Sequence, residues 1–286
     1  MKIILTLLIN FIINLASTSL YKENDKISLL VFYETQGFVH DEAIREGKVM
    51  MSKIGNKKNY NIIFAENSKL FEESYLNKID VIIFLCTTLD VLDENEEKAM
   101  KNFIRNGGGF VGIHSATDTE YEWEWYGKLV GAYFMNHPDI QKATIITEKK
   151  HHFLTDHLKD RWSIKDEWYN FKDFNPDINV LLSLDENSYE GGENGEYHPI
   201  SWYHEFEGGR SFYTGLGHVG ETYKDSRFVP KGHKNIVLEN ALILCINREL
   251  THFDDCVTLF TQIHEKNIPV LVLAKDMISG FDSVKL

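Results

Sequence analysis

The stretch Gly107-Gly108-Gly109-Phe110-Val111-Gly112-Ile113-His114-Ser115-Ala116 decides the fold of this chain. Three glycines end a preceding helix, a short apolar run follows, and small residues come directly after His114. Small flanking residues let the backbone bend tightly and present one side chain above a sheet. The pattern therefore predicts a strand, a sharp turn and a helix, with His114 at the turn.

His114 occupies the position at which such turns often carry a serine or cysteine nucleophile. Histidine titrates near neutral pH and is the commonest metal ligand among side chains. We therefore interpret His114 as a functional residue. The alternative interpretation is that His114 only ends a strand and is hydrogen-bonded there.

The segment before the glycine triplet alternates short apolar runs with helical spacing. Strands are predicted at residues 27–32, 60–64, 81–85 and 110–113, and helices at 42–54, 68–76 and 93–105. Asp93 and Glu96 have the spacing of a helix N-terminal capping box. This βαβ spacing predicts a mostly parallel sheet with helices on both faces.

Polar residues follow three of these strands, at 35–40, at Thr87-Thr88 and at His114-Ser115. Ligands of doubly wound sheets bind beyond the carboxyl ends of the strands. We therefore expect His40, Thr87 and His114 to lie at one edge of the sheet, with Thr87 supplying a hydroxyl to a ligand.

The character of the chain changes after residue 120. Further strands are predicted at 142–147, 162–168 and 179–184, a β-hairpin at 200–203 and 209–214, and helices at 123–130 and 235–248. His218 follows the hairpin across Gly215-Leu216-Gly217. The hairpin is expected as an addition to the parallel sheet, with His218 near His114.

Two kinds of chemistry are compatible with these residues. His114 and His218 can form a general acid–base pair, with Glu221 three residues after His218 as a third catalytic group. Alternatively, His40, His114 and His218 can hold a divalent metal ion, with Glu221 or Glu167 as the carboxylate ligand. No HExxH-type spacing occurs, so the sequence pattern alone does not assign a metal ion. A divalent metal ion stays open as a cofactor, and no other cofactor is predicted.

Acidic and aromatic residues at the end of a predicted strand suggest a sugar site. In Asp166-Glu167-Trp168-Tyr169-Asn170, the acids can accept hydrogen bonds from sugar hydroxyls and a ring can pack on the sugar face. A surface strand end is an equally good explanation. His198 and Trp202 are further candidates for substrate binding, although His198-Pro199 also fits a rigid entry into a strand. His151 and His152 are expected to be solvated.

Composition excludes some partners. The chain has 286 residues, 43% of them hydrophobic, and a formal net charge of -13. Binding to nucleic acid or to an anionic membrane requires a basic face, so neither is expected. Three cysteines do not form a disulfide framework, and Cys86 and Cys245 are expected to be buried free thiols.

Residues 1–19 resemble a secretory signal. Lys2 precedes an apolar run, and small residues follow at 16–19. The run is short for a membrane-spanning helix, which needs about 20 residues. We expect export with cleavage of the signal, so that the mature chain is not held in a membrane; a retained anchor is the alternative. The main domain is predicted at 28–248, followed by a C-terminal extension at 249–286.

Together these motifs resemble the ThuA-like (trehalose utilisation) family over residues 28–248. The resemblance rests on residues 32–40, 107–116, 166–169, 198–202 and 209–218. It implies a flavodoxin-like α/β fold of the class I glutamine amidotransferase-like superfamily. In that superfamily the sharp turn carries cysteine and a later loop carries histidine, whereas here the corresponding residues are His114 and His218. Because the thiol is absent and Cys86 ends a different strand, glutamine hydrolysis is not expected.

The resemblance also implies a small carbohydrate as the ligand, such as trehalose, a related disaccharide or a keto-sugar, and a pocket lined by His40, His114 and His218. The leading hypothesis is a secreted hydrolase or isomerase of such sugars, with Glu167, Tyr169 and Trp202 holding the sugar. A non-catalytic sugar-binding module and a metal-dependent hydrolase are the alternatives.

Overall fold

The structure is a computed structural model that describes residues 26–228 and 237–246. Its centre is a nine-stranded sheet with the strand order β2-β1-β3-β4-β11-β10-β9-β6-β7. The first five of these strands run parallel to one another. They are β2 (Asn61–Ala65), β1 (Ser28–Phe32), β3 (Val81–Leu85), β4 (Gly109–Ile113) and β11 (Gly209–Thr214).

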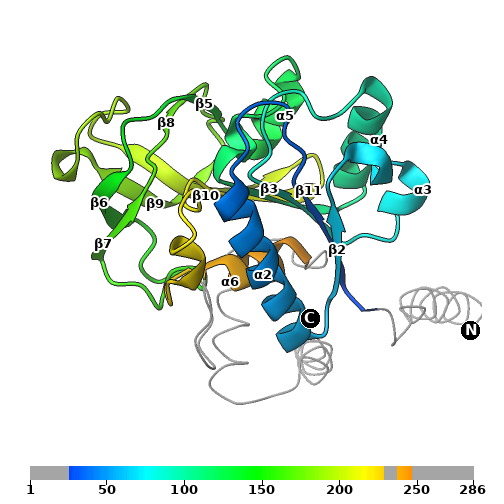
Figure 1. The fold of residues 1–286 in the computed structure, drawn as a ribbon, viewed down its shortest axis with the longest axis horizontal. Helices are drawn as coiled ribbons and strands as arrows, with labels where there is room; N and C mark the ends of the chain where they lie inside the picture. The colour runs from blue at the N-terminus through cyan, green and yellow to red at the C-terminus, as the bar shows by residue number, and fades with distance from the viewer. Residues whose placement is uncertain (1–25, 229–236, 247–286) are drawn as a thin grey trace, which may run out of the picture.

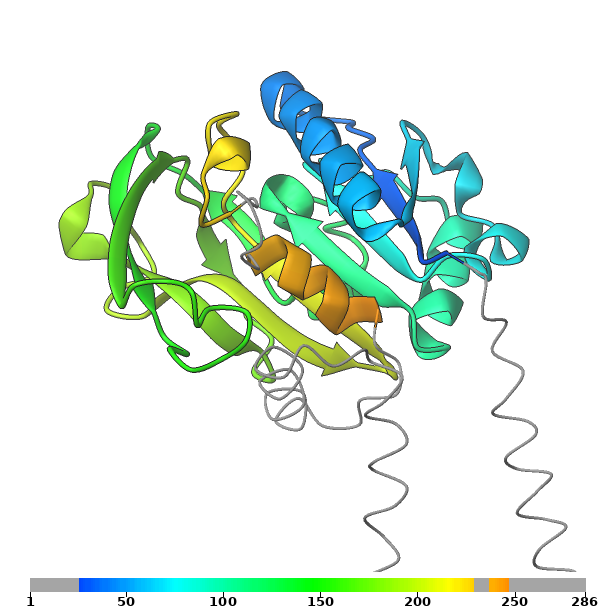
Figure 2. The same cartoon turned by 90° about the horizontal axis from the view of Figure 1, so that it is seen from below.

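Helices cover both faces of the parallel half of the sheet, as the βαβ spacing predicts. They are α2 (Asp41–Lys58), α3 (Glu73–Leu76), α4 (Glu94–Arg105), α5 (Glu124–Val130) and α6 (Val237–Ile246). Helices α2 and α6 lie on one face of the sheet, and α4 and α5 lie on the other (Figures 1 and 2). Residues 68–76, expected as one helix, form a 3₁₀ turn at Ser68–Leu70 followed by the short helix α3.

The remaining four strands of the sheet are joined antiparallel. They are β10 (His198–Phe206), β9 (Asn179–Asp185), β6 (Gln141–Thr147) and β7 (Arg161–Asp166). The predicted hairpin is present as β10 and β11, and it joins the two halves because β11 pairs parallel with β4. A separate two-stranded sheet is formed by β5 (Tyr133–Asn136) and β8 (Asn170–Lys172).

The glycine triplet ends α4 and allows close packing against β4. Gly107 has a φ of 87°, a left-handed conformation that suits glycine after a helix. A Cβ on Gly109 would lie 2.6 Å from the carbonyl oxygen of Cys245 in α6, so a side chain there would push the helix away. At the other end of α4, the Asp93–Glu96 capping box is present as predicted.

The antiparallel half is curved, so that its edge strand ends beside the loop that follows β11. Asp166 at the end of β7 accepts hydrogen bonds from the amides of Gly217 and His218, although β10, β9 and β6 lie between β7 and β11 in the sheet. Figure 2 shows this half curling up toward the open edge of the parallel half. The curvature brings residues from both halves to one place.

The remaining expectations have mixed outcomes. Cys86 and Cys245 are buried free thiols, as predicted. His152 is buried and its ring stacks on Tyr203, so only His151 of that pair is solvated.

No helix in the described residues is long and apolar enough to span a membrane. The predicted signal at 1–19, the extension at 249–286 and Cys256 lie outside the described residues, and the boundaries 28–248 remain a prediction.

Candidate functional site

The sharp turn after β4 has the backbone geometry that its sequence predicts. His114 has a φ of 53°, which is the left-handed region that non-glycine residues rarely adopt. The turn continues into a short 3₁₀ helix at His114–Thr117, at the position where the sequence predicts a helix. Such a strained conformation is typical of functional sites held by the surrounding fold. It projects His114 beyond the carboxyl edge of the sheet.

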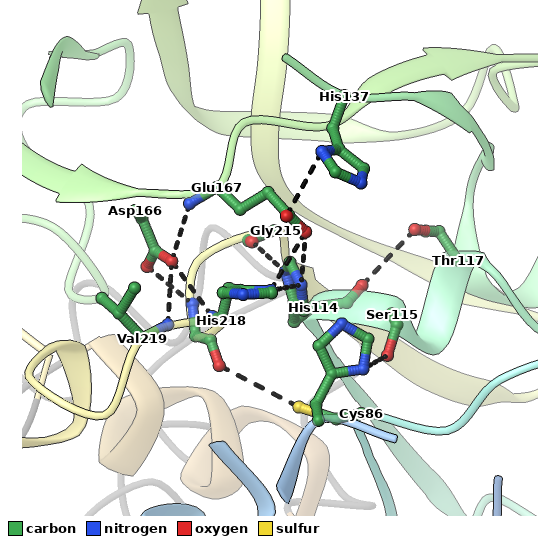
Figure 3. A network of polar contacts seen from close by, with 12 residues as sticks. Cys86, His114, Ser115, Thr117, His137, Asp166, Glu167, Gly215, His218 and Val219 are labelled. Carbon is green, nitrogen blue, oxygen red and sulfur yellow. Dashed lines mark hydrogen bonds and ion pairs between the residues drawn. The ribbon is translucent and has the colours of Figure 1, made fainter. Parts of the chain in front are cut away.

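Three histidines and one glutamate meet at this edge: His40, His114, Glu167 and His218. One ligand atom from each lies within 4.8 Å of the others. His40 directly precedes α2, His114 follows β4, Glu167 follows β7 and His218 follows β11. Figure 3 shows Glu167 facing His114 and His218 from the antiparallel half of the sheet. We call these four residues the His–Glu cluster.

Three atoms of the cluster form a small triangle. His114 Nε2 lies 3.1 Å from His218 Nδ1 and 3.4 Å from Glu167 Oε2, and His218 Nδ1 lies 3.0 Å from Glu167 Oε2. His114 Nδ1 lies 2.9 Å from the carbonyl oxygen of Gly215. A carbonyl only accepts hydrogen bonds, so Nδ1 carries a hydrogen, and Nε2 is the ring atom that faces the triangle.

Further groups hold the members of the cluster in place. Glu167 Oε1 lies 3.2 Å from His137 Nδ1, and His40 Nδ1 lies 3.4 Å from the hydroxyl of Ser115. The Asp166 carboxylate accepts hydrogen bonds from the amides of His218 and its two neighbours and from the Thr222 hydroxyl. Each side chain of the cluster is therefore oriented by a partner outside it or by its own backbone (Figure 3).

Burial and mutual charge set the ionisation of the cluster. Burial, together with the charges of His114 and His218, lowers the pKa of His40 to about 2, so His40 is neutral. Burial raises the pKa of Glu167, but the close contacts with His114 and His218 outweigh it and hold that pKa well below its usual value. Burial lowers the pKa of His218, but the hydrogen bond and charge of Glu167 reverse this effect and raise it. Glu167 is thus a buried carboxylate that depends on its histidine partners.

The structure brings His40, His114 and His218 together and supplies Glu167 as their carboxylate. Glu221, the other predicted carboxylate, is exposed and lies outside the cluster. Glu167 was expected to hold sugar hydroxyls, whereas its two oxygens face histidines.

The remaining predicted substrate-binding residues are buried. Trp202 lies in the core, and its indole N–H donates to the carbonyl oxygen of Val130. Thr87 shares a hydrogen bond with Thr119. His198 contacts Glu186 and the carbonyl oxygen of Tyr169. Tyr169 is nearly fully buried, with its ring centroid 4.3 Å from that of His114, so it packs against one member of the cluster.

Sequence reasoning missed two residues at the site, His137 and Phe38. His137 lies in an irregular segment before Pro138, where neither helical nor strand periodicity singles it out. Phe38 is 66% exposed, and its ring centroid lies 4.8 Å from that of His40. An exposed aromatic beside a histidine in a loop was the available signal for Phe38.

Comparison with known proteins gives a family and several solved structures. The family model ThuA, described as trehalose utilisation, matches residues 28–231. A ThuA-like protein from Bacteroides uniformis is 21% identical, with a TM-score of 0.64 over 80% of this chain and 93% of that one. A ThuA-like protein from Parabacteroides merdae is 15% identical, with a TM-score of 0.58 over 79% and 92%. No curated protein in the comparison matches this chain.

A β-galactosidase from Bacillus circulans is 12% identical, with a TM-score of 0.50 over 80% of this chain and 32% of that one. At these identities the structures are similar in fold alone. The predicted fold class, a doubly wound α/β sheet with helices on both faces and an added β-hairpin, is confirmed.

Proposed function

The chain belongs to the ThuA family, described as trehalose utilisation, and we propose that it is an enzyme acting on carbohydrates, as a hydrolase or isomerase of disaccharides or keto-sugars. The His–Glu cluster is the observation that carries this proposal. Ligands of doubly wound sheets bind at this edge. A buried carboxylate among histidines lowers stability unless it is well paired, and such clusters of perturbed groups gather at catalytic sites. The cluster therefore favours catalysis over binding alone.

Phe38 supports a sugar as the ligand. Its ring lies beside the cluster, 4.8 Å from His40 and 6.5 Å from His218 between ring centroids. The loop is fixed by Thr88, whose hydroxyl accepts from the amide of Gly37 and donates to the carbonyl oxygen of Phe38. A sugar presents both an apolar C–H face and hydroxyl groups, and it therefore fits a site that combines an aromatic ring with a few convergent polar groups.

Acyl transfer through a cysteine thioester has no support in the part of the chain that the structure describes. His114 stands at the turn where the nucleophile would be, and burial raises the pKa of Cys86 to about 12. A thiol that stays protonated at neutral pH is a poor nucleophile. The carboxylate of Glu167 and the histidines around it are the groups available to exchange protons with hydroxyls or to hold an electrophile.

An NMR time course on the full-length chain tests the proposed function. The substrates are trehalose, sucrose, maltose and their 3-keto forms. We expect new sugar signals with the unmodified chain and with His151→Ala, an exposed histidine outside the cluster, and none with His114→Ala. Sugar binding detected by saturation transfer, without conversion of any of these sugars by folded protein, would contradict catalysis and indicate a binding module.

A further inference from the structure

We propose that His40, His114, Glu167 and His218 bind one divalent transition-metal ion, with Zn²⁺ as the ion that best suits the donor set. Imidazole nitrogen is a good ligand for zinc and other late first-row ions, whereas Mg²⁺ and Ca²⁺ prefer sites made of oxygen. This inference rests on the proposed function only in placing the ion where substrate would react.

The spacing of the cluster matches that of ligands around a tetrahedral ion. Atoms bound at about 2.0–2.1 Å to such an ion lie about 3.3–3.4 Å from one another. The three sides of the triangle between His114, His218 and Glu167 measure 3.0, 3.1 and 3.4 Å. The ligand atom of His40 completes the group within 4.8 Å. The side chains need only small adjustments to surround one ion.

The orientation of the side chains is that of metal ligands. A ligating histidine usually donates its second ring N–H to a carbonyl or carboxylate, which turns the free nitrogen toward the metal. His114 does so through Nδ1 and the carbonyl oxygen of Gly215. His40 faces the Ser115 hydroxyl through Nδ1, which leaves its Nε2 for the cluster. Glu167 turns one oxygen to His137 and the other to the triangle.

Hydrogen bonding alone leaves the triangle poorly satisfied. In the tautomer that carries its hydrogen on Nδ1, His114 Nε2 is an acceptor, and it lies 3.4 Å from Glu167 Oε2, a second acceptor. His218 Nδ1 faces both atoms and carries at most one hydrogen. Converging acceptors that share a single donor are unfavourable in a buried site, whereas a cation between them interacts favourably with every member.

A bound ion would change the roles assigned to two residues. His114 and His218 would then act as ligands and not as the acid–base pair that the sequence suggested. An ion of this class polarises a carbonyl or hydroxyl oxygen as a Lewis acid, and zinc sites can expand their coordination to admit that oxygen. Such chemistry suits both hydrolysis and isomerisation of a keto-sugar.

The test measures metal binding by the full-length chain after metal has been removed with a chelator. We expect calorimetric titration with Zn²⁺ to show one ion per chain, and Co²⁺ to give the visible absorption of a site with nitrogen ligands. Mg²⁺ should not compete. Loss of a residue that contacts a metal ligand lowers metal affinity by about 10- to 100-fold, so His137→Ala should weaken Zn²⁺ binding by such a factor. His114→Ala and Glu167→Gln should weaken Zn²⁺ binding by a larger factor. The exposed control His151→Ala should bind Zn²⁺ as the unmodified chain does.

Circular dichroism checks that each variant is folded, and Glu167→Gln keeps the shape of the side chain if His114→Ala does not fold. The metal site is refuted if stripped, folded protein does not bind Zn²⁺ stoichiometrically, or if Glu167→Gln binds as tightly as His151→Ala. If the protein converts a sugar but does not bind Zn²⁺, the metal site is refuted and the proposed enzymatic function still stands. If it binds one Zn²⁺ but converts no sugar, the proposed function is refuted and the metal site still stands.

Discussion

The two halves of the sheet contribute to the site in different ways. The parallel half places His40, His114 and His218 at one edge because the carboxyl ends of its strands all point there. The antiparallel half contributes Glu167, and it reaches the same place only because it curves back toward the loop after β11. Parallel topology thus gathers the histidines, and tertiary curvature adds the carboxylate between them.

The largest expected effect tests whether the two halves share one core. Trp202 in β10 is fully buried, packs against Tyr213 of β11 and donates to Val130 at the end of α5. Trp202→Ala should lower the free energy of unfolding by about 3–5 kcal/mol, because it opens a large cavity. Urea unfolding followed by circular dichroism measures this change. A loss below about 1 kcal/mol would show that the antiparallel half contributes little to the common core.

The contact between the halves is tested at Asp166. This buried carboxylate accepts hydrogen bonds from three successive amides, those of residues 217–219, and from the hydroxyl of Thr222. Asp166→Asn removes the negative charge and places an NH₂ group among hydrogen-bond donors. We expect this change to lower the free energy of unfolding by about 2–4 kcal/mol. Asp160→Asn, at the exposed residue before β7, is the matched control and should leave the unfolding curve nearly unchanged. Equal curves for the two variants would contradict this role of Asp166.

The pH dependence of stability is tested at His204 in the antiparallel half. Burial lowers the pKa of His204 to about 4, and the hydrogen bond to the carbonyl oxygen of Lys128 only partly offsets this effect. As the pH falls below about 6.5, the unfolded chain binds a proton that the folded chain does not, so stability decreases down to about pH 4. The full shift corresponds to about 3 kcal/mol.

His204→Gln should remove this contribution to the pH dependence, whereas His151→Gln, an exposed residue, should retain it. The measurement is the free energy of unfolding in urea between pH 7 and pH 4. If the free energy of unfolding of His204→Gln changes with pH as steeply as that of the unmodified chain, His204 is not held neutral in the folded state.

The smallest expected effect on stability is at Phe38 in the parallel half. Its side chain is mostly exposed, so Phe38→Ala should change the free energy of unfolding by less than about 0.5 kcal/mol. Loss of the ring should nevertheless weaken sugar binding, which saturation-transfer NMR with trehalose measures. Phe38 would then contribute to sugar binding and not to stability, whereas Trp202 would contribute to the stability of the core. A stability loss comparable to that of Trp202→Ala would remove this contrast.

Most of the parallel half could be predicted from the sequence. The buried runs, the capping box at Asp93 and the glycine triplet are local signals, and topology alone then brings His40, His114 and His218 to one edge. The carboxylate could not be chosen locally. Glu221 is near His218 in the sequence, whereas Glu167 is near it only after β7 has curved across the intervening strands.

Trp202 illustrates a second limit of sequence reasoning. Aromatic residues suit both sugar-binding surfaces and cores, and composition does not distinguish these environments. Strand β10 is buried along most of its length, with both Ser201 and Trp202 inside, so alternation does not reveal an exposed face. His137 was missed for a different reason, because irregular segments have no period from which a side-chain direction can be inferred.

The hydrogen bonds of Asp166 also bear on how the chain folds. The groups that bind this carboxylate lie 51 to 56 positions away in the sequence. The loop that carries His218 therefore has these partners only once the edge strand β7 has docked. A chain in which β7 is detached would retain the parallel half of the sheet but would lack an assembled site, so binding activity would report the docking of this strand.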